Sequence, residues 1–237
     1  MQWDVRYVEQ TGSTNADLLE LARQGAPPGT VIRAGHQTAG RGRMSRAWQA
    51  PAGTSLLASI LLPAEPVAFF VVARVALAAA DACQAMAGVG AWLKWPNDLV
   101  VGDRKLAGLL AEADEGAANI VVGIGCNMAW PLEGRPLELL ERMTCLSDHT
   151  STPPAPADLL DGLLARLTKW LRFRPDEVLA AYAARCATLG SRVRVDLGER
   201  SMAGTATGLA STGALELAAG GRTVVVHAGD VVHVRAG

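Results

Sequence analysis

The fold is decided by residues 91–127, which read AWLKWPNDLVVGDRKLAGLLAEADEGAANIVVGIGCN. Short apolar runs alternate here with turn residues, a pattern typical of β-strands, and they lie at 91–95, 99–101, 104–111 and 119–123. Gly102-Asp103 is a two-residue turn of the hairpin-forming type. We therefore expect Leu99–Val101 and Lys105–Leu109 to pair as antiparallel neighbours.

Upstream of this stretch, the sequence predicts strands and helices in alternation. Ser13-Thr14-Asn15 offers capping side chains for a helix that Gly25 would end. The other predicted elements are strands at Val5–Val8, Thr30–Ala34 and Ser55–Leu62 and an Ala-rich helix at Pro66–Ala87. Gly35–Thr54 is too long for a simple connector, and loops of this length are often functional.

Downstream, two helical patterns follow a Pro-rich loop at residues 151–156, and they cover Ala157–Arg172 and Asp176–Leu189. Strands and helices are therefore mixed along the chain. This order predicts a mixed α/β or α+β domain and not a doubly wound parallel sheet.

Residues 190–237 change character. Short apolar runs, separated by turn signals that begin at Gly198, predict a small antiparallel unit of about five strands, the size of an SH3-like barrel. The runs lie at Val193–Leu197, Ala206–Leu209, Ala214–Leu217, Thr223–Val226 and Val231–Val234. We expect two domains, at residues 1–189 and 190–237.

Composition excludes several classes of protein. The chain of 237 residues has 22 Lys+Arg and 23 Asp+Glu, so neither a polybasic nucleic-acid binder nor an acidic disordered chain is expected. Arg74 and Asp81 interrupt the best candidate for a membrane helix, which needs about 18 apolar residues. Residues 1–10 are too charged for a signal peptide, and the four cysteines form no CxxC pair. We expect a cytoplasmic protein that is not held at a membrane and has no dedicated metal site.

An arginine-rich segment, Gly40–Trp48, is the first stretch that points to chemistry. No acidic residue lies between Glu20 and Glu65, although five arginines do, so the segment has no local counter-ion and should attract an anion. A solvated basic loop is the alternative. The segment fits neither the Walker pattern nor the Rossmann fingerprint.

Two further stretches carry candidate functional residues. Only three lysines occur in the chain, and Lys94 and Lys105 flank the sequence Trp95-Pro96-Asn97-Asp98. The alternative for this stretch is an ordinary turn with a surface lysine. Gly123-Ile124-Gly125-Cys126-Asn127 ends a strand with glycines that would let a ligand approach, although glycine also marks bulges.

Together these segments resemble the biotin protein ligases. The resemblance covers residues 5–237 in the family's order and spacing, and its motifs are Ser13-Thr14-Asn15, Gln37, Gly40-Arg41-Gly42-Arg43 with Trp48, Lys94–Asp98, Arg104–Gly108, and Gly123, Gly125 and Asn127. It implies an α+β fold with a central mixed sheet flanked by helices, like that of class II aminoacyl-tRNA synthetases, followed by an SH3-like barrel.

The resemblance also implies a two-step reaction. Biotin and ATP give biotinyl-adenylate and pyrophosphate, with Mg²⁺ carried by ATP. The biotinyl group then passes to a lysine of a biotin carboxyl carrier protein, such as that of acetyl-CoA carboxylase. The chain would act as a monomer or homodimer.

Site residues follow residue by residue from the matched motifs. The catalytic residues would be Lys105, Arg43 and Asp98. Biotin would contact Ser13, Thr14, Asn15, Gln37, Arg41, Gly42, Arg43, Lys105, Gly108, Gly123 and Gly125. ATP or the adenylate would contact Arg41, Arg43, Arg46, Trp48, Lys94, Asn97 and Asn127. For Trp48, a place in the core is the alternative.

Departures from the family pattern bear on these expectations. Met44-Ser45 stands where many members carry bulky or basic residues, and Cys126 stands where an aliphatic residue is usual, so we expect Cys126 to be a small apolar wall residue. The pattern begins by residue 5, which leaves no room for the N-terminal helix-turn-helix domain of some members, and we expect no DNA binding. The alternatives are a lipoate protein ligase of the same fold, a non-enzymatic DNA regulator and an inactive biotin-binding module.

Overall fold

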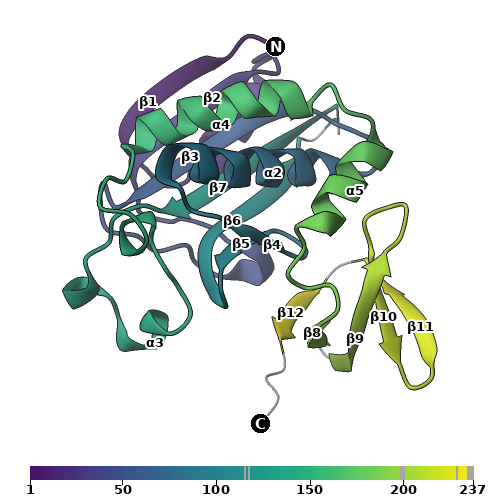
Figure 1. Ribbon diagram of the computed structural model, residues 1–237. Helices are drawn as coiled ribbons and strands as arrows, with labels where there is room; N and C mark the ends of the chain where they lie inside the picture. The colour runs from purple at the N-terminus through teal and green to yellow at the C-terminus, as the bar shows by residue number, and fades with distance from the viewer. Residues whose placement is uncertain (115, 117, 198–200, 228, 234–237) are drawn as a thin grey trace.

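The computed structural model describes residues 1–114, 116, 118–197, 201–227 and 229–233. A seven-stranded sheet forms its centre, in the order β1-β2-β3-β7-β6-β5-β4 (Figure 1). Its strands are β1 (Asp4–Thr11), β2 (Thr30–Gln37), β3 (Ser55–Pro63), β4 (Trp92–Lys94), β5 (Asp98–Val101), β6 (Arg104–Ala113) and β7 (Asn119–Asn127). β1 and β2 pair in parallel and the other neighbours are antiparallel, which confirms the mixed sheet and the hairpin of β5 and β6.

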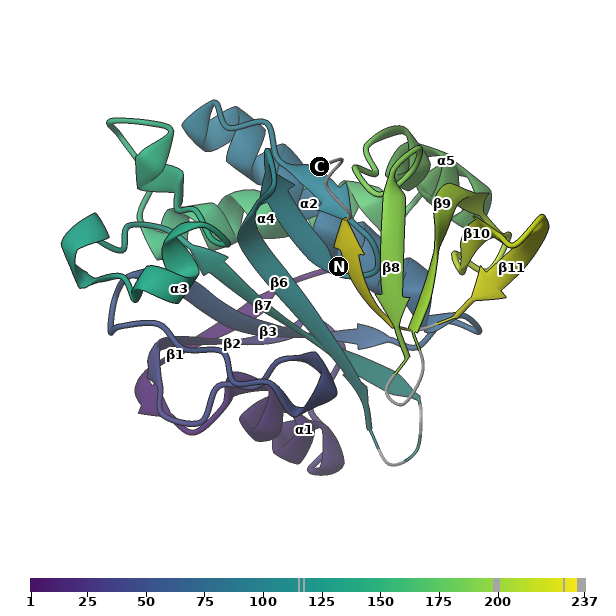
Figure 2. The ribbon, with the colours of Figure 1, turned by 90° about the horizontal axis from the view of Figure 1, so that it is seen from below.

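Helices cover both faces of this sheet. α1 lies on one face, and α2 and α4 lie on the other (Figure 2). The helices are α1 (Thr14–Arg23), α2 (Ala68–Ala87), α3 (Leu137–Leu140), α4 (Pro156–Trp170) and α5 (Pro175–Ala184). Because both faces of β3 are covered, residues Ser55–Leu62 are all buried, and a mostly apolar run, interrupted by Ser59, replaces the alternation of a half-exposed strand.

Helix α2 is the core helix of the protein. By length and composition it could cross a membrane despite Arg74 and Asp81, but 67% of its most apolar stretch is buried inside the fold. Arg74 forms a buried ion pair with Glu65 (3.1 Å), and Asp81 accepts a hydrogen bond from Trp170 Nε1 (2.8 Å). Its apolar surface is therefore covered by protein.

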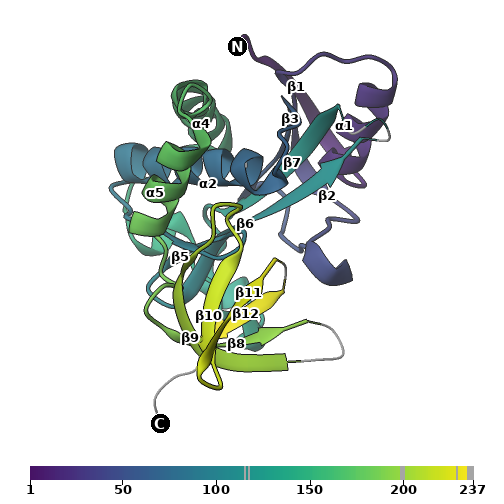
Figure 3. The same cartoon turned by 90° about the vertical axis from the view of Figure 1, so that its right-hand side faces the viewer.

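A second, five-stranded sheet is wholly antiparallel, in the order β11-β10-β9-β8-β12, as expected for the small C-terminal unit. Its strands are β8 (Arg192–Asp196), β9 (Ser201–Leu209), β10 (Leu215–Ala219), β11 (Arg222–Val226) and β12 (Asp230–His233). It lies next to α5 at one end of the larger sheet (Figure 3). Trp95 Nε1 donates to the Gly213 carbonyl (2.9 Å), so the two sheets share a buried contact.

Several predicted boundaries differ from those observed. β2 continues to Gln37 because Gln37 pairs with Thr11, and β7 continues to Asn127 because Asn127 pairs with Ser55. Pairing with neighbouring strands thus extends these strands through polar residues that local preference assigns to loops. Other boundaries that shift include those of β1, which ends at Thr11, β9, which begins at Ser201, and α5, which ends at Ala184. Helix α3 was not predicted, and Gly198 and Val234 lie outside the described residues.

Candidate active site

One pocket on the larger sheet collects nearly all of the predicted site residues. It is bounded by the start of α1, the end of β2, the arginine-rich segment and the middle of β6 and β7. Of the predicted residues, those that line it are Ser13, Thr14, Asn15, Gln37, Arg41, Gly42, Arg43, Arg46, Trp48, Asn97, Asp98, Lys105, Gly108, Gly123 and Gly125.

Glycines form the floor of the pocket. Gly108 and Gly125 are direct neighbours across β6 and β7. A Cβ at Gly125 would lie 2.7 Å from Trp48 Cζ2, and one at Gly108 would lie 2.8 Å from Lys105 Nζ. A side chain at Gly125 would therefore displace the Trp48 indole, and one at Gly108 would displace the Lys105 ammonium.

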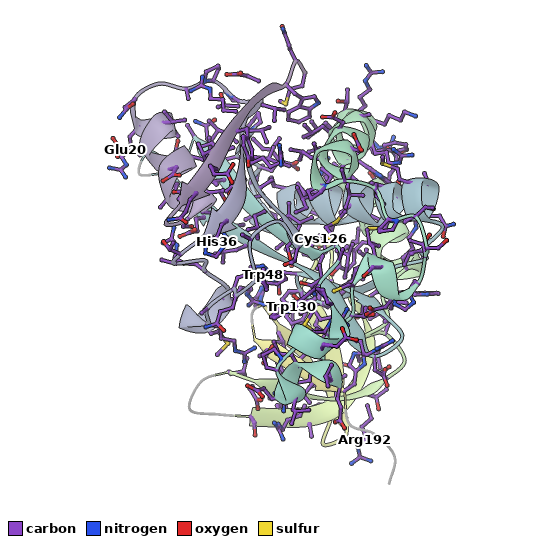
Figure 4. The ribbon with its side chains drawn as sticks, turned by 90° about the vertical axis from the view of Figure 1, so that its left-hand side faces the viewer. Glu20, His36, Trp48, Cys126, Trp130 and Arg192 are labelled. Carbon is purple, nitrogen blue, oxygen red and sulfur yellow. The ribbon has the colours of Figure 1, made fainter. Side chains whose placement is uncertain are left out.

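Trp48, which is labelled in Figure 4, packs on this glycine floor. Lys105 Nζ lies 5.6 Å from the centroid of the indole ring, within the range of a cation–π contact. Trp48 Nε1 is buried and has no hydrogen-bond partner among the described residues. Trp48 is thus a wall of the pocket and not a residue of the hydrophobic core.

A polar network fixes the start of α1. Gln37 Oε1 accepts hydrogen bonds from Thr14 N (2.8 Å) and Thr14 Oγ1 (2.9 Å). Ser59 Oγ lies within hydrogen-bonding distance of Thr14 Oγ1 (2.7 Å) and Asn15 Oδ1 (2.6 Å). Asn15 Nδ2 donates to Glu112 (2.7 Å). Ser13 occupies the N-cap position without a capping hydrogen bond from its side chain, so the expected capping role is wrong, and the Thr14 amide at the helix start is taken by Gln37 instead.

Two members of this network are absent from the predicted set. Ser59 is the polar residue inside the buried strand β3, and that isolated polarity was a usable signal. Glu112 lies near the end of β6, where a carboxylate resembles any surface charge. Its Oε2 accepts from Asn15 and lies 3.2 Å from Arg41, so it joins the start of α1 to the arginine-rich segment.

The arginines of this segment have acceptors that are distant in sequence. Arg41 pairs with Glu112 as above, and Arg46 pairs with Asp230 of β12 (2.5 Å). Arg43 donates to Asn97 Oδ1 (3.0 Å) and to the Gly229 carbonyl (3.3 Å). The segment has no counter-ion in the local sequence, and the fold supplies Glu112 and Asp230 from distant strands.

These contacts shift the pKa values of two arginines in opposite directions. Burial lowers the pKa of Arg43, and Asp98 and Asp230 oppose that effect. The hydrogen bond to Asp230 raises the pKa of Arg46. Both guanidinium groups carry charge at neutral pH because arginine starts from a pKa above 12.

Lys105 faces the pocket because β6 contains a bulge. Leu99 pairs with Ala107 but Val100 pairs with Lys105, so Leu106 is an extra residue in the strand. Leu106 and Ala107 both lie in the hydrophobic core, while Lys105 turns to the pocket face that it shares with Gly108. There Lys105 Nζ lies 2.8 Å from Asp98 Oδ1.

Lys94 and Asn127 do not line this pocket. Lys94, on β4, faces an adjoining hollow that also reaches Asp98, Lys105 and Arg46. Asn127 is buried behind Lys105, and its Nδ2 donates to the carbonyls of Lys105 (3.3 Å) and Thr144 (3.2 Å). The structure therefore brings Asn127 to the backbone of Lys105 and not to the pocket surface.

Cys126 is also absent from the pocket. It is buried in the core beside Cys83 of α2, and a hydrogen bond with Cys83 together with burial raises the pKa of the Cys126 thiol. A thiol with a raised pKa is a poor nucleophile.

Comparisons with known proteins identify the family of the chain. A family model described as the Biotin/lipoate A/B protein ligase family matches residues 7–128, and one described as the Biotin protein ligase C terminal domain matches residues 188–234. The biotin–[acetyl-CoA-carboxylase] ligase of Mycobacterium tuberculosis is 40% identical over 96% of this chain and 88% of its own length. The bifunctional ligase/repressor BirA of Escherichia coli is 31% identical over 86% of this chain and 66% of its own length. Among solved structures, the biotin protein ligase from Aquifex aeolicus in complex with biotin and ATP has a TM-score of 0.85 at 25% identity, covering 98% of this chain and 99% of that chain.

Proposed function

Because the chain belongs to the biotin protein ligase family and is an ATP-dependent ligase, we propose how the residues of its pocket divide the work between the two steps of biotin transfer. In the first step, a carboxylate oxygen of biotin bonds to the α-phosphorus of ATP and pyrophosphate leaves. In the second, the amine of a carrier lysine bonds to the acyl carbon and AMP leaves.

The start of α1 and Gln37 bind the polar head of biotin. Gln37 Oε1 is already occupied by Thr14, so its Nε2 is the group left to donate to a ligand. The network of Ser59, Asn15 and Glu112 holds these groups in place before biotin arrives. A ligand without matching polar atoms would leave buried groups unpaired, which is the physical source of selectivity.

Lys105 stabilises charge at the reacting atoms. Its ammonium lies at the junction of the pocket and the adjoining hollow, where a carboxylate and an α-phosphate would meet. A positive charge fixed at that point lowers the energy of the transition state more than that of the ground state. Asp98 holds Lys105 in the first step and orients, or takes a proton from, the carrier amine in the second.

The arginine-rich segment closes over the adenylate. Arg41, Arg43 and Arg46 each have a protein acceptor that an anionic ligand would replace or supplement. Arg43 would contact the α-phosphate, and Arg46 would assist departure of pyrophosphate. Trp48 forms the wall that excludes water from the mixed anhydride, and water exclusion protects it from hydrolysis.

Mg²⁺ enters as part of the nucleotide. The described residues contain no group of three or more His, Cys, Asp or Glu side chains that could bind a metal by themselves. In this proposal the triphosphate carries the ion. In that position Mg²⁺ neutralises phosphate charge.

The biological setting is part of the same proposal. The acceptor is a lysine on a biotin carboxyl carrier protein. The chain acts in the cytoplasm as a monomer or homodimer and does not bind DNA. A formal net charge of -1 supports the last point, since DNA binding relies on concentrated positive charge.

The observation that carries the proposal is the convergence of Lys105, Arg43 and the polar start of α1 on one glycine-floored pocket. The test is incubation with ATP, Mg²⁺, biotin and a carrier domain, followed by intact mass. We expect one biotinyl group on the carrier, and none when ATP is omitted. Lipoate replaces biotin in a parallel reaction. An unmodified carrier contradicts the proposal, and preferential use of lipoate identifies the enzyme as a lipoate ligase.

A further inference from the structure

A buried ion pair lies outside the pocket, in the segment of residues 128–150 that joins β7 to α4. The Arg135 side chain is only 1% exposed. It donates to both carboxylate oxygens of Asp148 (2.8 and 2.6 Å) and to the Trp130 carbonyl (2.8 Å). Asp148 also accepts from Thr144 Oγ1 (2.9 Å) and from the Cys145 amide (2.9 Å).

This pair is fully hydrogen-bonded and stays ionised. Burial raises the pKa of Asp148, but the bonds from Arg135, the Cys145 amide and Thr144 outweigh that effect and hold it well below its ordinary value. Burying two charges is costly, and apolar residues of similar volume stabilise many proteins equally well. The gain from such a pair is a single, well-defined arrangement of the chain around it.

The segment that this pair holds is bonded directly to the backbone of Lys105. The Lys105 amide donates to the Arg142 carbonyl (2.8 Å), and the Lys105 carbonyl accepts from the Thr144 amide (2.9 Å). Residues 142–144 thus lie beside β6 and form an isolated parallel β-bridge at Lys105 and Met143. They occupy the place that β7 does not reach, because β6 and β7 pair only from Ala107 onward.

Lys105 needs this second neighbour because it lies next to the bulge. An unpaired residue disrupts the ladder locally and bends the strand. The peptide of Lys105 is held on one side by Val100 and on the other by residues 142–144. Without the second contact, only the short β5–β6 pairing beyond the bulge and the bond from Asn127 Nδ2 to the Lys105 carbonyl would oppose a shift of Lys105 away from Asp98.

We propose that Arg135 and Asp148 are positioning residues for Lys105 and act through the bridging segment of residues 142–144. This inference rests on the proposed function, since it assigns them to the adenylation step. Neither residue lines the pocket, and both lie apart from the residues proposed to bind biotin. Their loss should therefore reduce the rate of adenylation and leave the KM for biotin nearly unchanged.

The first test compares Asp148→Asn with wild type by single-turnover formation of biotinyl-adenylate, well below the unfolding temperature of each protein. A displacement of about 1 Å at a reacting group can cost about 100-fold in rate. We expect kcat to fall by about 10- to 100-fold while the KM for biotin stays within about threefold of wild type. Thr144→Val is a milder variant that removes one hydrogen bond to Asp148 and should lower kcat less.

Glu65→Gln is the matched control. This substitution also breaks the ion pair of a buried arginine, Arg74. That arginine lies in α2, away from Lys105. Glu65→Gln should lower the unfolding temperature and leave kcat unchanged.

A double-mutant cycle separates positioning from general stability. If Asp148 acts through Lys105, Asp148→Asn should cause almost no further loss of kcat in a Lys105→Arg background, although both backgrounds lose the same stability. Multiplicative losses of kcat, or wild-type kcat in both Asp148→Asn and Thr144→Val, overturn the inference. If wild type forms no adenylate, the proposed function fails first and the inference fails with it.

Discussion

Asp98 and Lys105 face each other across the β5–β6 hairpin, with 2.8 Å between Oδ1 and Nζ. The lysine lies so close to the sheet that a Cβ on Gly108 would be 2.9 Å from its Cε. A guanidinium is broader than an ammonium and planar, so this site offers it too little room. In a chain with only three lysines, the choice of lysine here has a steric reason.

Lys105→Arg should therefore impair adenylation although it keeps the charge. We expect a loss of at least about tenfold in ATP–pyrophosphate exchange, comparable to the loss of one preorganised electrostatic contact. Lys169→Arg, on the exposed face of α4, is the control and should behave as wild type. Wild-type exchange by Lys105→Arg would show that Lys105 has another role.

Gly125→Ala should weaken biotin binding by pushing Trp48 off the pocket floor. The added methyl would meet the indole at 2.7 Å, and overpacking of this kind costs about 1–3 kcal/mol. Isothermal titration should show a rise in the Kd for biotin of about 10-fold or more. Gly12→Ala adds the same methyl where no atom lies within 4 Å, and it should leave the Kd unchanged.

Glu112→Gln should loosen the link between the start of α1 and the arginine-rich segment. The amide keeps an acceptor for Asn15 but loses the charge that faces Arg41. Because Arg41 is partly exposed, we expect only about a two- to fivefold rise in the KM for biotin. The difference in KM between Glu112→Gln and wild type should shrink when both proteins are measured at high salt. A KM for biotin that changes neither with the substitution nor with salt would contradict the assignment of Glu112 to the site.

Arg43→Gly should release the adenylate early. Arg43 holds the segment to Asn97 and to the backbone of Gly229, and its loss removes both contacts and a charge near the phosphate. We expect faster dissociation of biotinyl-adenylate and biotinylation of a bystander protein, measured by filter binding and blotting. The same dissociation rate as wild type, with no labelled bystander, would contradict a closing role for the segment.

Asp148 should contribute stability that depends on pH. Its pKa is lowered in the folded protein, so its contribution is present above the unfolded value of about 3.9 and is lost as the pH falls below it. The free energy of unfolding of wild type should therefore exceed that of Asp148→Asn at pH 7. The difference should shrink at pH 3. A difference that is constant with pH would contradict the lowered pKa.

Much of the site could be predicted from sequence because its motifs are local. The arginine-rich segment and Lys105 stand out by charge and composition in a short stretch, whereas Ser13-Thr14-Asn15 entered the predicted site through the family resemblance. Glu112 and Asp230 could not be found in this way, because their importance comes from partners that only the fold brings near. The same holds for Arg135 and Asp148, which resemble surface charges until their burial is known.

The fold shows a similar division. Apolar periodicity located both sheets and the long helices. It placed the ends of β2 and β7 too early, since Gln37 and Asn127 join their strands through pairing with Thr11 and Ser55. Strand pairing depends on two segments at once, so the sequence of either segment alone does not predict where the paired strand ends.

The bulge in β6 changes the parity of that strand. In an uninterrupted strand, residues an odd number of positions apart point to opposite faces, so Lys105 and Gly108 could not both face the pocket. Because Leu106 is an extra residue, Lys105 and Gly108 lie on the same face of β6 although an odd number of positions separates them. A regular ladder in which Leu106 took a paired position would leave the composition and charge of the motif intact. It would also turn the ammonium of Lys105 toward the core, so the functional unit is the spacing as much as the lysine.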